Sequence, residues 1–269
     1  MPMTDNHQPK RTSLPGIADE EIDAHFGLLP ENYFAQADAA EVTLHIGMVN
    51  QLLQSINRAD SLGSLRPIIE WHDAPGGEFT AVHVVTWDRA GLFHKLAGAC
   101  SVAGLNILAA RITTRADHIA IDTFHVAEPS GGAVRREKAK LLFGQTIEAA
   151  LTGQVDLLPA ILAQAQSHPG ARIETLAQPG VAIYREIFSA RLIVEIQAAD
   201  RIGLLYRVGQ IFAQRGFNLS AALVATERGQ AVDRFHLEPG NPQACDDGQL
   251  AALREALLST ITETAAPGV

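Results

Sequence analysis

The chain has 269 residues, of which 47% are hydrophobic and 19% are charged, so it is long enough for two modest globular cores. Its formal net charge of −9 argues against nucleic acid as the main partner, because phosphate backbones are bound by basic surfaces. Two cysteines, Cys100 and Cys245, exclude a disulfide framework and indicate a reducing, cytoplasmic setting. No apolar run reaches the ~20 residues that span a bilayer, so no membrane association is expected.

The N-terminal part combines a polar tail with a helical segment. Residues 1–17 lack the apolar core of a secretory signal and are expected to form a flexible tail. Apolar residues then recur at helical intervals, most clearly between residues 42 and 56, which predicts a helical lead-in over residues 18–62. Apolar and polar residues alternate in RPIIEWHD and GEFTAVHVVTWD, and the APGG turn between them predicts a hairpin.

A first series of elements follows this hairpin. The pattern turns helical at Asp88, predicts strands in ILAARITTR and HIAIDTFHV, and ends with a helix over residues 134–153. A linker with its own short helix, DLLPAILAQAQSH, precedes a second series in the same order. That series comprises the strands VAIYREIF and ARLIVEIQAAD, a helix over residues 202–214, the strands NLSAALVATE and QAVDRFHLE, and a helix over residues 247–263.

The two series are copies of one another. The segments that begin DRAGLFHKLAGACSVAGLNI and DRIGLLYRVGQIFAQRGFNL share nine identical residues over 28 aligned positions. Asp122 and Phe124 also return, as Asp233 and Phe235. Such agreement at a nearly constant offset indicates an internal duplication.

Each copy predicts an α+β fold of the ferredoxin-like kind, an antiparallel sheet with two helices on one face. The final segment TAAPGV is too short for the usual last strand. The strand that precedes each copy is therefore expected to take that edge position, because a hairpin partner is antiparallel to its neighbour. The expected domains are a first copy over residues 63–154, a linker over residues 155–178 and a second copy over residues 179–265.

The repeated polar residues permit two interpretations. Asp88 and Asp200 precede the repeated helices, where a carboxylate caps the first turn. Gly91 and Gly203 follow in that turn, where glycine costs ~1 kcal/mol relative to alanine, which indicates that something approaches the backbone closely. An asparagine opens the strand after each helix and serves either as a turn residue or as a donor and acceptor for an amino acid. The exposed N–H groups at the helix start suit a ligand carboxylate.

These motifs resemble the tandem ACT domains at the C-terminal end of bacterial PII uridylyltransferase/uridylyl-removing enzymes. The stretches DRAGLF, GLNILAARI and DRIGLLYRV match the repeats of that family, and IDAHFGLLPENYF resembles the segment that joins its HD domain to the ACT pair. The usual proline of the motif is replaced by Ala90 and Ile202, which loosens the loop before each helix. A small ligand is expected to contact Asp88, Arg89, Ala90, Gly91, Leu92, Asn106 and Ile107 in the first copy and Asp200, Arg201, Ile202, Gly203, Leu204, Asn218 and Leu219 in the second.

The resemblance implies a regulatory protein that binds an amino acid, with glutamine as the first candidate, and that is linked to nitrogen regulation. Catalysis is not expected, because no Asp-x-Asp follows Gly63 and Ser64 to hold Mg²⁺ for nucleotidyl transfer. The dyad His72-Asp73 ends a predicted strand, whereas a metal phosphohydrolase gathers its ligands from several helices. The other histidines lack metal-ligand spacing, so no metal and no cofactor are expected.

Three kinds of function stay open. In the first, a free-standing pair of ACT domains senses an amino acid, forms a homodimer through these domains and acts on a PII-type signal protein or a separate catalytic subunit. In the second, the chain is the regulatory part of a PII uridylyltransferase. In the third, the chain is a purely structural interaction module, and the repeated Asp, Gly and Asn residues serve only caps and turns.

Overall fold

The computed structural model describes residues 14–56, 66–153, 155–167, 178–186, 191–227, 230–240 and 245–263. The helices are α1 (Asp19–Leu28), α2 (Glu31–Phe34), α3 (Ala39–Ile56), α4 (Leu92–Val102), α5 (Glu137–Thr152), α6 (Leu158–Ser167), α7 (Leu204–Gln214) and α8 (Asp247–Thr262). The strands are β1 (Ile68–Asp73), β2 (Thr80–Trp87), β3 (Asn106–Thr114), β4 (Ile119–Ala127), β5 (Gly180–Arg185), β6 (Leu192–Ala199), β7 (Phe217–Leu223), β8 (Thr226–Glu227) and β9 (Gln230–Pro239). None of the described helices combines the length and the hydropathy that a membrane crossing requires.

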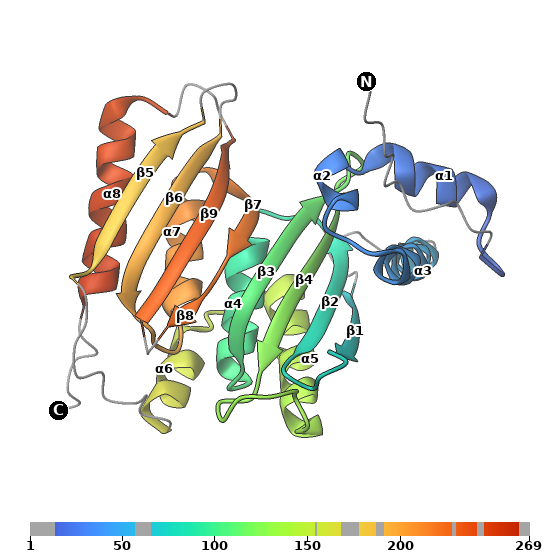
Figure 1. Ribbon diagram of the computed structural model, residues 1–269, viewed down its shortest axis with the longest axis horizontal. Coiled ribbons are helices and arrows are strands. Elements are labelled where there is room, and N and C mark those ends of the chain that lie inside the picture. The colour runs from blue at the N-terminus through green and yellow to red at the C-terminus, as the bar shows by residue number, and fades with distance from the viewer. Residues whose placement is uncertain are drawn as a thin grey trace, which may run out of the picture. The chain divides into compact units, whose positions relative to one another are not determined.

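The strands form one sheet in the order β1-β2-β4-β3-β7-β9-β6-β5, and β8 pairs with β9 (Figure 1). In the second repeat, β5 pairs antiparallel with β6, from Gly180 opposite Gln197 to Arg185 opposite Leu192. In the first repeat, β1 takes the corresponding edge position next to β2. The α+β class and the permuted edge strand predicted from the sequence are thus confirmed.

The chain divides into two compact units that cut across the repeats. The first unit comprises residues 1–70, 83–88 and 113–122, and the second comprises residues 71–82, 89–112 and 123–269. The domain limits expected from the sequence therefore stay a prediction.

In the first unit, the N-terminal helices share a hydrophobic core with parts of two strands. Val49 and Leu52 of α3 belong to one buried cluster with Val85 of β2 and Ile121 of β4. The apolar stripe predicted for the lead-in forms this contact, because residues three and four apart lie on one face of a helix. The helical character of the lead-in is confirmed up to Ile56, and this part consists of α1, α2 and α3.

In the second unit, the first helices of the two repeats pack against each other. A Cβ atom on Gly98 of α4 would lie 2.7 Å from Tyr206 Cδ2, and one on Gly209 of α7 would lie 2.7 Å from Phe93 Cδ1. Any side chain at these two positions would overlap its neighbour, so the glycines permit the close approach of α4 and α7.

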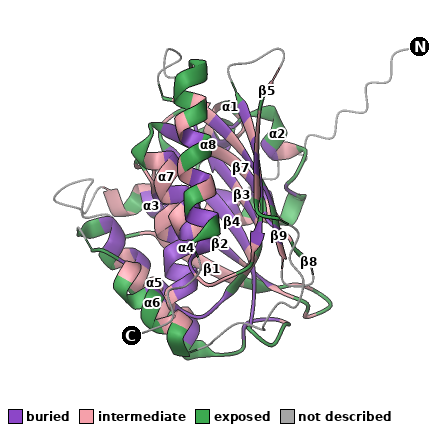
Figure 2. Ribbon diagram, turned by 90° about the vertical axis from the view of Figure 1, so that its left-hand side faces the viewer, coloured by how far each residue is buried: buried purple, intermediate pink, exposed green. Residues whose placement is uncertain are grey.

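The strands of the second unit also join the two repeats. β3 and β7 pair antiparallel, with Ala110 opposite Ala222. Figure 2 shows α4, α7 and α8 together on one face of the strands. The repeats therefore pair within the chain, a question that the sequence left open, whereas the expected homodimer stays a prediction.

Some predicted elements differ from the structure. α4 and α7 begin one residue after Gly91 and Gly203, later than predicted, because the left-handed backbone of these glycines cannot continue into a right-handed helix. The strand predicted over residues 218–227 is divided into β7 and β8. Several predictions fall on positions outside the described residues, namely residues 1–13 of the tail, residues 57–62 of the lead-in, Gly63 and Ser64, residues 168–177 of the linker, residues 187, 188 and 190, and residues 264 and 265.

Candidate functional site

The repeated motif places a glycine at the N-cap of the first helix in each repeat. Gly91 caps α4 with φ 75°, and Gly203 caps α7 with φ 86°, in the left-handed region that favours glycine. Neither cap has a side-chain hydrogen bond. The N-cap position is therefore taken by a glycine three residues after Asp88 and Asp200, and a contact of these carboxylates with the first turn stays a prediction.

The aspartates belong to the turns that precede the helices. The backbone N–H of Asp88 donates to the carbonyl oxygen of His118 at 2.8 Å. Asp200 Oδ2 accepts a hydrogen bond from Thr226 Oγ1 at 2.9 Å. Each contact fixes the chain where a strand leads into the motif.

The motif arginines cap the carbonyl ends of the second helices. Arg89 Nη1 donates to the carbonyl oxygen of Leu151 in α5. Arg201 donates from Nη1 to the carbonyl oxygen of Glu263 and from Nη2 to that of Thr260, the latter at 2.5 Å, at the end of α8. In both repeats the arginine precedes the residue whose carbonyl accepts from its Nη1 by 62 residues, so the contact is duplicated with the repeat. A guanidinium group there satisfies unpaired carbonyls and complements the helix dipole, so these side chains have a structural role.

Within one repeat, the loop and the asparagine lie at opposite ends of the sheet. Asn218 pairs with Glu238, and Leu192 at the start of β6 pairs with the neighbouring Leu237. The loop begins at Asp200, after the eight residues of β6. At ~3.3 Å per residue the separation is roughly 25 Å, too far for one amino acid to bridge. A single repeat therefore does not assemble the predicted site.

The pairing of the repeats brings the loop of one close to the asparagine of the other. The antiparallel bridge between Ala110 and Ala222 places the start of each strand toward the end of its partner. Consistent with this arrangement, a Cβ atom on Gly91 would lie 3.4 Å from Ala213 Cβ in the last turn of α7. α7 then leads within a few residues to Asn218.

The loop of the second repeat and the asparagine of the first repeat both lie near α6. A Cβ atom on Gly203 would lie 2.5 Å from Ile161 Cγ2, and one on Gly104 would lie 2.4 Å from Gln164 Nε2. Since Ile161 and Gln164 are about one turn apart on α6, the loop of the second repeat and the turn before Asn106 contact the same short helix. We distinguish two candidate sites: the Gly91 site, which comprises residues 89–92, His94 and Asn218, and the Gly203 site, which comprises residues 201–204 and Asn106.

α6 makes the two sites unequal. At the Gly203 site, Gly203 is buried, and Ile202 packs against a cluster that includes Ile161. At the Gly91 site, Ala90 is exposed and Gly91 is half-buried. A side chain of the protein itself approaches each glycine, Ile161 of α6 at Gly203 and His94 at Gly91, where a Cβ atom would lie 2.3 Å from His94 Cε1. The two sites therefore differ in the exposure of their loops and in the element that supplies this side chain.

His94 adds a polar group to the Gly91 site that the motif comparison missed. Its Nδ1 would lie 2.7 Å from a Cβ atom on Gly91, and this buried nitrogen has no hydrogen-bond partner among the described residues. Burial, with a smaller contribution from Lys95, lowers the pKa of His94 to about 4, so the ring is neutral at pH 7. The second repeat has Tyr206 at the matching position, so a search for identical residues could not find it.

A cavity of about 270 Å³ lies at the end of α7. It is lined by Gln214, Arg215, Phe217 and Gln249. Phe217 directly precedes Asn218 in β7, but the two side chains point to opposite faces of the strand, so this cavity is not part of the Gly91 site.

The remaining predicted contact residues differ in exposure. Leu92 and Leu204 are buried at the first positions of α4 and α7. Ile107 and Leu219 are half-buried in β3 and β7. Both asparagines, Asn106 and Asn218, are exposed, and the turn before Asn106 lies against α6.

Each repeat also buries a carboxyl group. Asp122 on β4 and Asp233 on β9 each have one side-chain oxygen without a hydrogen-bond partner among the described residues. Burial raises the pKa of Asp122 well above its ordinary value and that of Asp233 to about 7, and nearby Asp88 and Asp200 act in the same direction. The sequence marked these aspartates as duplicated but gave no sign of their burial.

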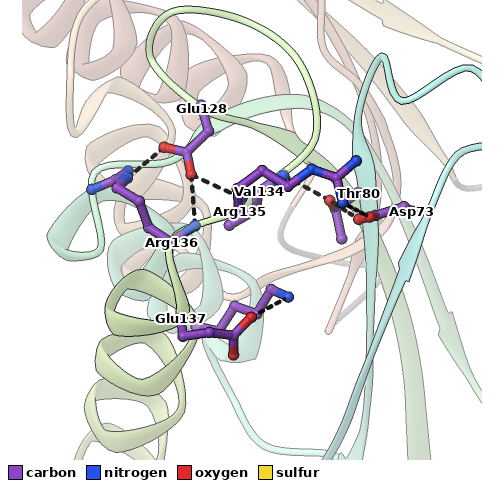
Figure 3. Close-up of polar contacts among 8 residues, drawn as sticks. Asp73, Thr80, Glu128, Val134, Arg135, Arg136 and Glu137 are labelled. Carbon is purple, nitrogen blue, oxygen red and sulfur yellow. Dashed lines mark hydrogen bonds and ion pairs between the residues drawn. The ribbon is translucent and has the colours of Figure 1, made fainter.

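The dyad His72-Asp73 lies at the end of β1, as predicted, and its carboxylate is used within the fold (Figure 3). Asp73 accepts hydrogen bonds from Thr80 Oγ1 at 2.7 Å and from Arg135 Nη1 at 2.6 Å. The hydrogen bond from Thr80 is the main cause that lowers the pKa of Asp73. Figure 3 also shows Glu128 bound to Arg136 near the start of α5. These contacts give Asp73 a structural role.

The sequence missed a polar cluster in the first unit. Glu41 and His45 of α3 and His83 of β2 bring three ligand-type atoms within 4.8 Å of one another. Two of the three residues have a sequence signal, since Glu41 and His45 are four residues apart on a predicted helix. His83 comes from a strand, so no local spacing connects it to the pair.

The fold and the repeated site define the class of protein. Residues 192–243 match the ACT domain, and the ferredoxin-like repeats have the corresponding α+β architecture, so the chain carries an ACT regulatory fold. The resemblance predicted from the motifs is confirmed: the chain is homologous to the C-terminal region of bifunctional uridylyltransferase/uridylyl-removing enzymes.

Two of these relatives illustrate the extent of the match. The enzyme of Rhodospirillum rubrum is 32% identical over 210 residues, which is 78% of this chain and 22% of the relative. That of Gluconobacter oxydans is 29% identical over 256 residues, which is 94% of this chain and 26% of the relative. The chain thus spans about a quarter of the length of the curated relatives it matches. It matches their ACT-containing regulatory region.

Among solved structures, the chain is similar to a putative glycine cleavage system transcriptional repressor. The match has 18% sequence identity and a TM-score of 0.23, and it covers 66% of this chain and 89% of the other.

Proposed function

We propose that this chain is a non-catalytic sensor in which the paired repeats bind one small amino acid at the Gly91 site. The observation that carries the proposal is the unpaired Nδ1 of His94 beside Gly91, at the one of the two matched sites whose loop is exposed. An unpaired buried nitrogen costs free energy until a ligand supplies its partner.

The chemistry of the Gly91 site suits an α-amino acid. The start of α4 presents backbone N–H groups and the positive end of a helix dipole, which favour the ligand carboxylate. The neutral His94 Nδ1 accepts a hydrogen bond from the ligand ammonium group. Asn218 offers both a donor and an acceptor, which an amide side chain requires, so glutamine is the first candidate.

Signalling follows if the ligand prefers one packing of the repeats. The loop at Gly91 belongs to one repeat and Asn218 to the other, so a ligand that contacts both favours one arrangement of α4 and α7. The receiver would be a catalytic subunit or a PII-type signal protein, by similarity to enzymes named as uridylyltransferases.

Calorimetry with a panel of amino acids tests this proposal. We expect heat with glutamine, a stoichiometry of about one per chain, and at least roughly tenfold weaker binding after Asn218→Ala, because a polar group of the ligand loses its partner. Asn106→Ala is the matched control, since its site is covered by α6, and it should bind like the wild type. Absence of heat with every amino acid at millimolar concentration would favour a purely structural module.

A second candidate function, uridylyl transfer, rests on the names of the relatives. Incubation of the chain with a PII protein, UTP and Mg²⁺ distinguishes the two. We expect no uridylylation by this chain alone, and transfer by the chain would overturn the non-catalytic proposal.

A further inference from the structure

The cluster of Glu41, His45 and His83 in the first unit has the geometry of a metal site. His45 Nε2 lies 3.0 Å from His83 Nδ1, and Glu41 Oε1 lies 3.9 Å and 3.7 Å from these two nitrogens. A point at the centre of this triangle is about 2.1 Å from all three atoms, which is the bond length of zinc to imidazole nitrogen and carboxylate oxygen. We propose that Glu41, His45 and His83 bind one zinc ion.

The burial of the cluster supports a preformed site. The side chain of His45 is fully buried, that of His83 is 5% exposed and that of Glu41 is 18% exposed. Two imidazoles and one carboxylate are a common zinc ligand set, and the partial exposure of Glu41 leaves a side open for water as the fourth ligand.

A second shell orients His45. Tyr33 Oη lies 2.8 Å from His45 Nδ1, and the tyrosine itself is buried. If Nδ1–H donates to Tyr33, the opposite nitrogen, Nε2, carries the lone pair that faces the cation. Tyr33 Oη in turn lies 3.5 Å from His25 Nε2. If His25 Nε2 accepts a hydrogen bond from the Tyr33 hydroxyl, the hydroxyl oxygen accepts the hydrogen bond from His45.

The carboxylate distinguishes a metal site from a plain hydrogen-bond chain. Tyr33, His45 and His83 form such a chain, and Glu41 Oε1 lies at ion-pair distance from both rings, 3.7 Å from His83 Nδ1 and 3.9 Å from His45 Nε2. A cation between the three groups explains why a carboxylate lies at this distance from both rings. The ion would hold α3 against β2 within the first unit. This proposal departs from the expectation of no metal, which rested on local spacing.

The test uses the full chain after dialysis against a chelator. Zinc chloride is titrated by calorimetry, bound metal is counted by mass spectrometry, and cobalt chloride reports coordination through its visible absorption. We expect one zinc ion per chain, visible cobalt bands of a four-coordinate site, and a higher melting temperature with zinc, because the ion binds the folded state.

Variants locate the ion. Glu41→Gln keeps the size of the side chain and should weaken zinc binding roughly tenfold or more. His83→Gln should abolish binding, and Tyr33→Phe should weaken it by about 10- to 100-fold. His72→Gln, at an exposed position of β1, is the control and should bind zinc like the wild type. The proposal would be overturned if zinc gave no heat and cobalt gave no visible bands. It would also be overturned if Glu41→Gln and His83→Gln both bound zinc with wild-type affinity. If His83→Gln does not fold, the affinity of Glu41→Gln alone decides.

Discussion

The Gly91 site and the Gly203 site derive from one duplicated motif, yet only the loop of the Gly91 site has an exposed residue. Both have a left-handed glycine at the helix start and a structural arginine. At the Gly203 site, Ile161 of α6 lies against the glycine, whereas the Gly91 site has exposed Ala90 and the unpaired His94 nitrogen. A duplication therefore preserves the backbone of a site, while the linker between the copies decides which site a ligand can enter.

The largest expected effect concerns the buried carboxyl of each repeat. The pKa of Asp233 is raised to about 7 in the folded chain, so the folded state binds this proton more tightly than the unfolded state does. Stability is therefore lost as the pH rises from about 4 to 7, by on the order of 4 kcal/mol. Asp233→Asn should remove this slope, as measured by urea unfolding at several pH values.

Asp122→Asn is the matched variant in the first repeat. The pKa of Asp122 is raised well above its ordinary value, so this variant should also flatten the pH dependence. If Asp233→Asn has the same pH slope as the wild type, the buried carboxyl does not titrate as described.

Removing the side chain that covers the Gly203 site should make the two sites more alike. Ile161 is 2% exposed, so Ile161→Ala should lower the free energy of unfolding by about 3 kcal/mol. Because the variant uncovers Gly203, the ligand stoichiometry in calorimetry should rise from about one to about two. Leu162→Ala, on an exposed position of the same helix, should change neither value. A stoichiometry that stays at one in Ile161→Ala would contradict the role given to α6.

The contact between the repeats depends on small residues. Gly209→Ala places a Cβ atom 2.7 Å from Phe93 Cδ1, so overpacking should cost about 2 kcal/mol in thermal unfolding. Gly47→Ala in α3 is the control, because nothing lies within 4 Å of its Cβ position, and it should stabilise the chain by ~0.5–1 kcal/mol through helix propensity. Equal effects of the two substitutions would mean that α4 and α7 do not pack this closely.

The smallest expected effect concerns the two arginines that cap the second helices. Arg201 donates to two carbonyl oxygens at the end of α8, and Arg89 donates to the carbonyl oxygen of Leu151 in α5. Arg201→Met and Arg89→Met should each lower the free energy of unfolding by about 1.5 kcal/mol, as measured by chemical unfolding. Unchanged stability of either variant would contradict the structural role given to that arginine.

The sequence predicted the elements of the fold better than the assembly of the site. Helical and alternating periodicities are local, so they located the duplicated helices and strands and the edge position of β5. Gly91 and Asn218 come together only through the pairing of the two repeats, and no local sequence pattern predicts that pairing. The same reason hid His83, because its partners come from a helix 38 residues earlier in the chain. The conformation of Gly91 and Gly203 was also missed, since a motif does not distinguish a left-handed cap from a close contact.

Hydrogen–deuterium exchange with and without glutamine tests the central claim most directly, because it reports on both sites in one experiment. The account predicts slower exchange at residues 89–92 and 218–219 and unchanged exchange at residues 201–204 and 106–107. Equal protection of both loops, or no protection at either, would contradict a single exposed site shared between the two repeats.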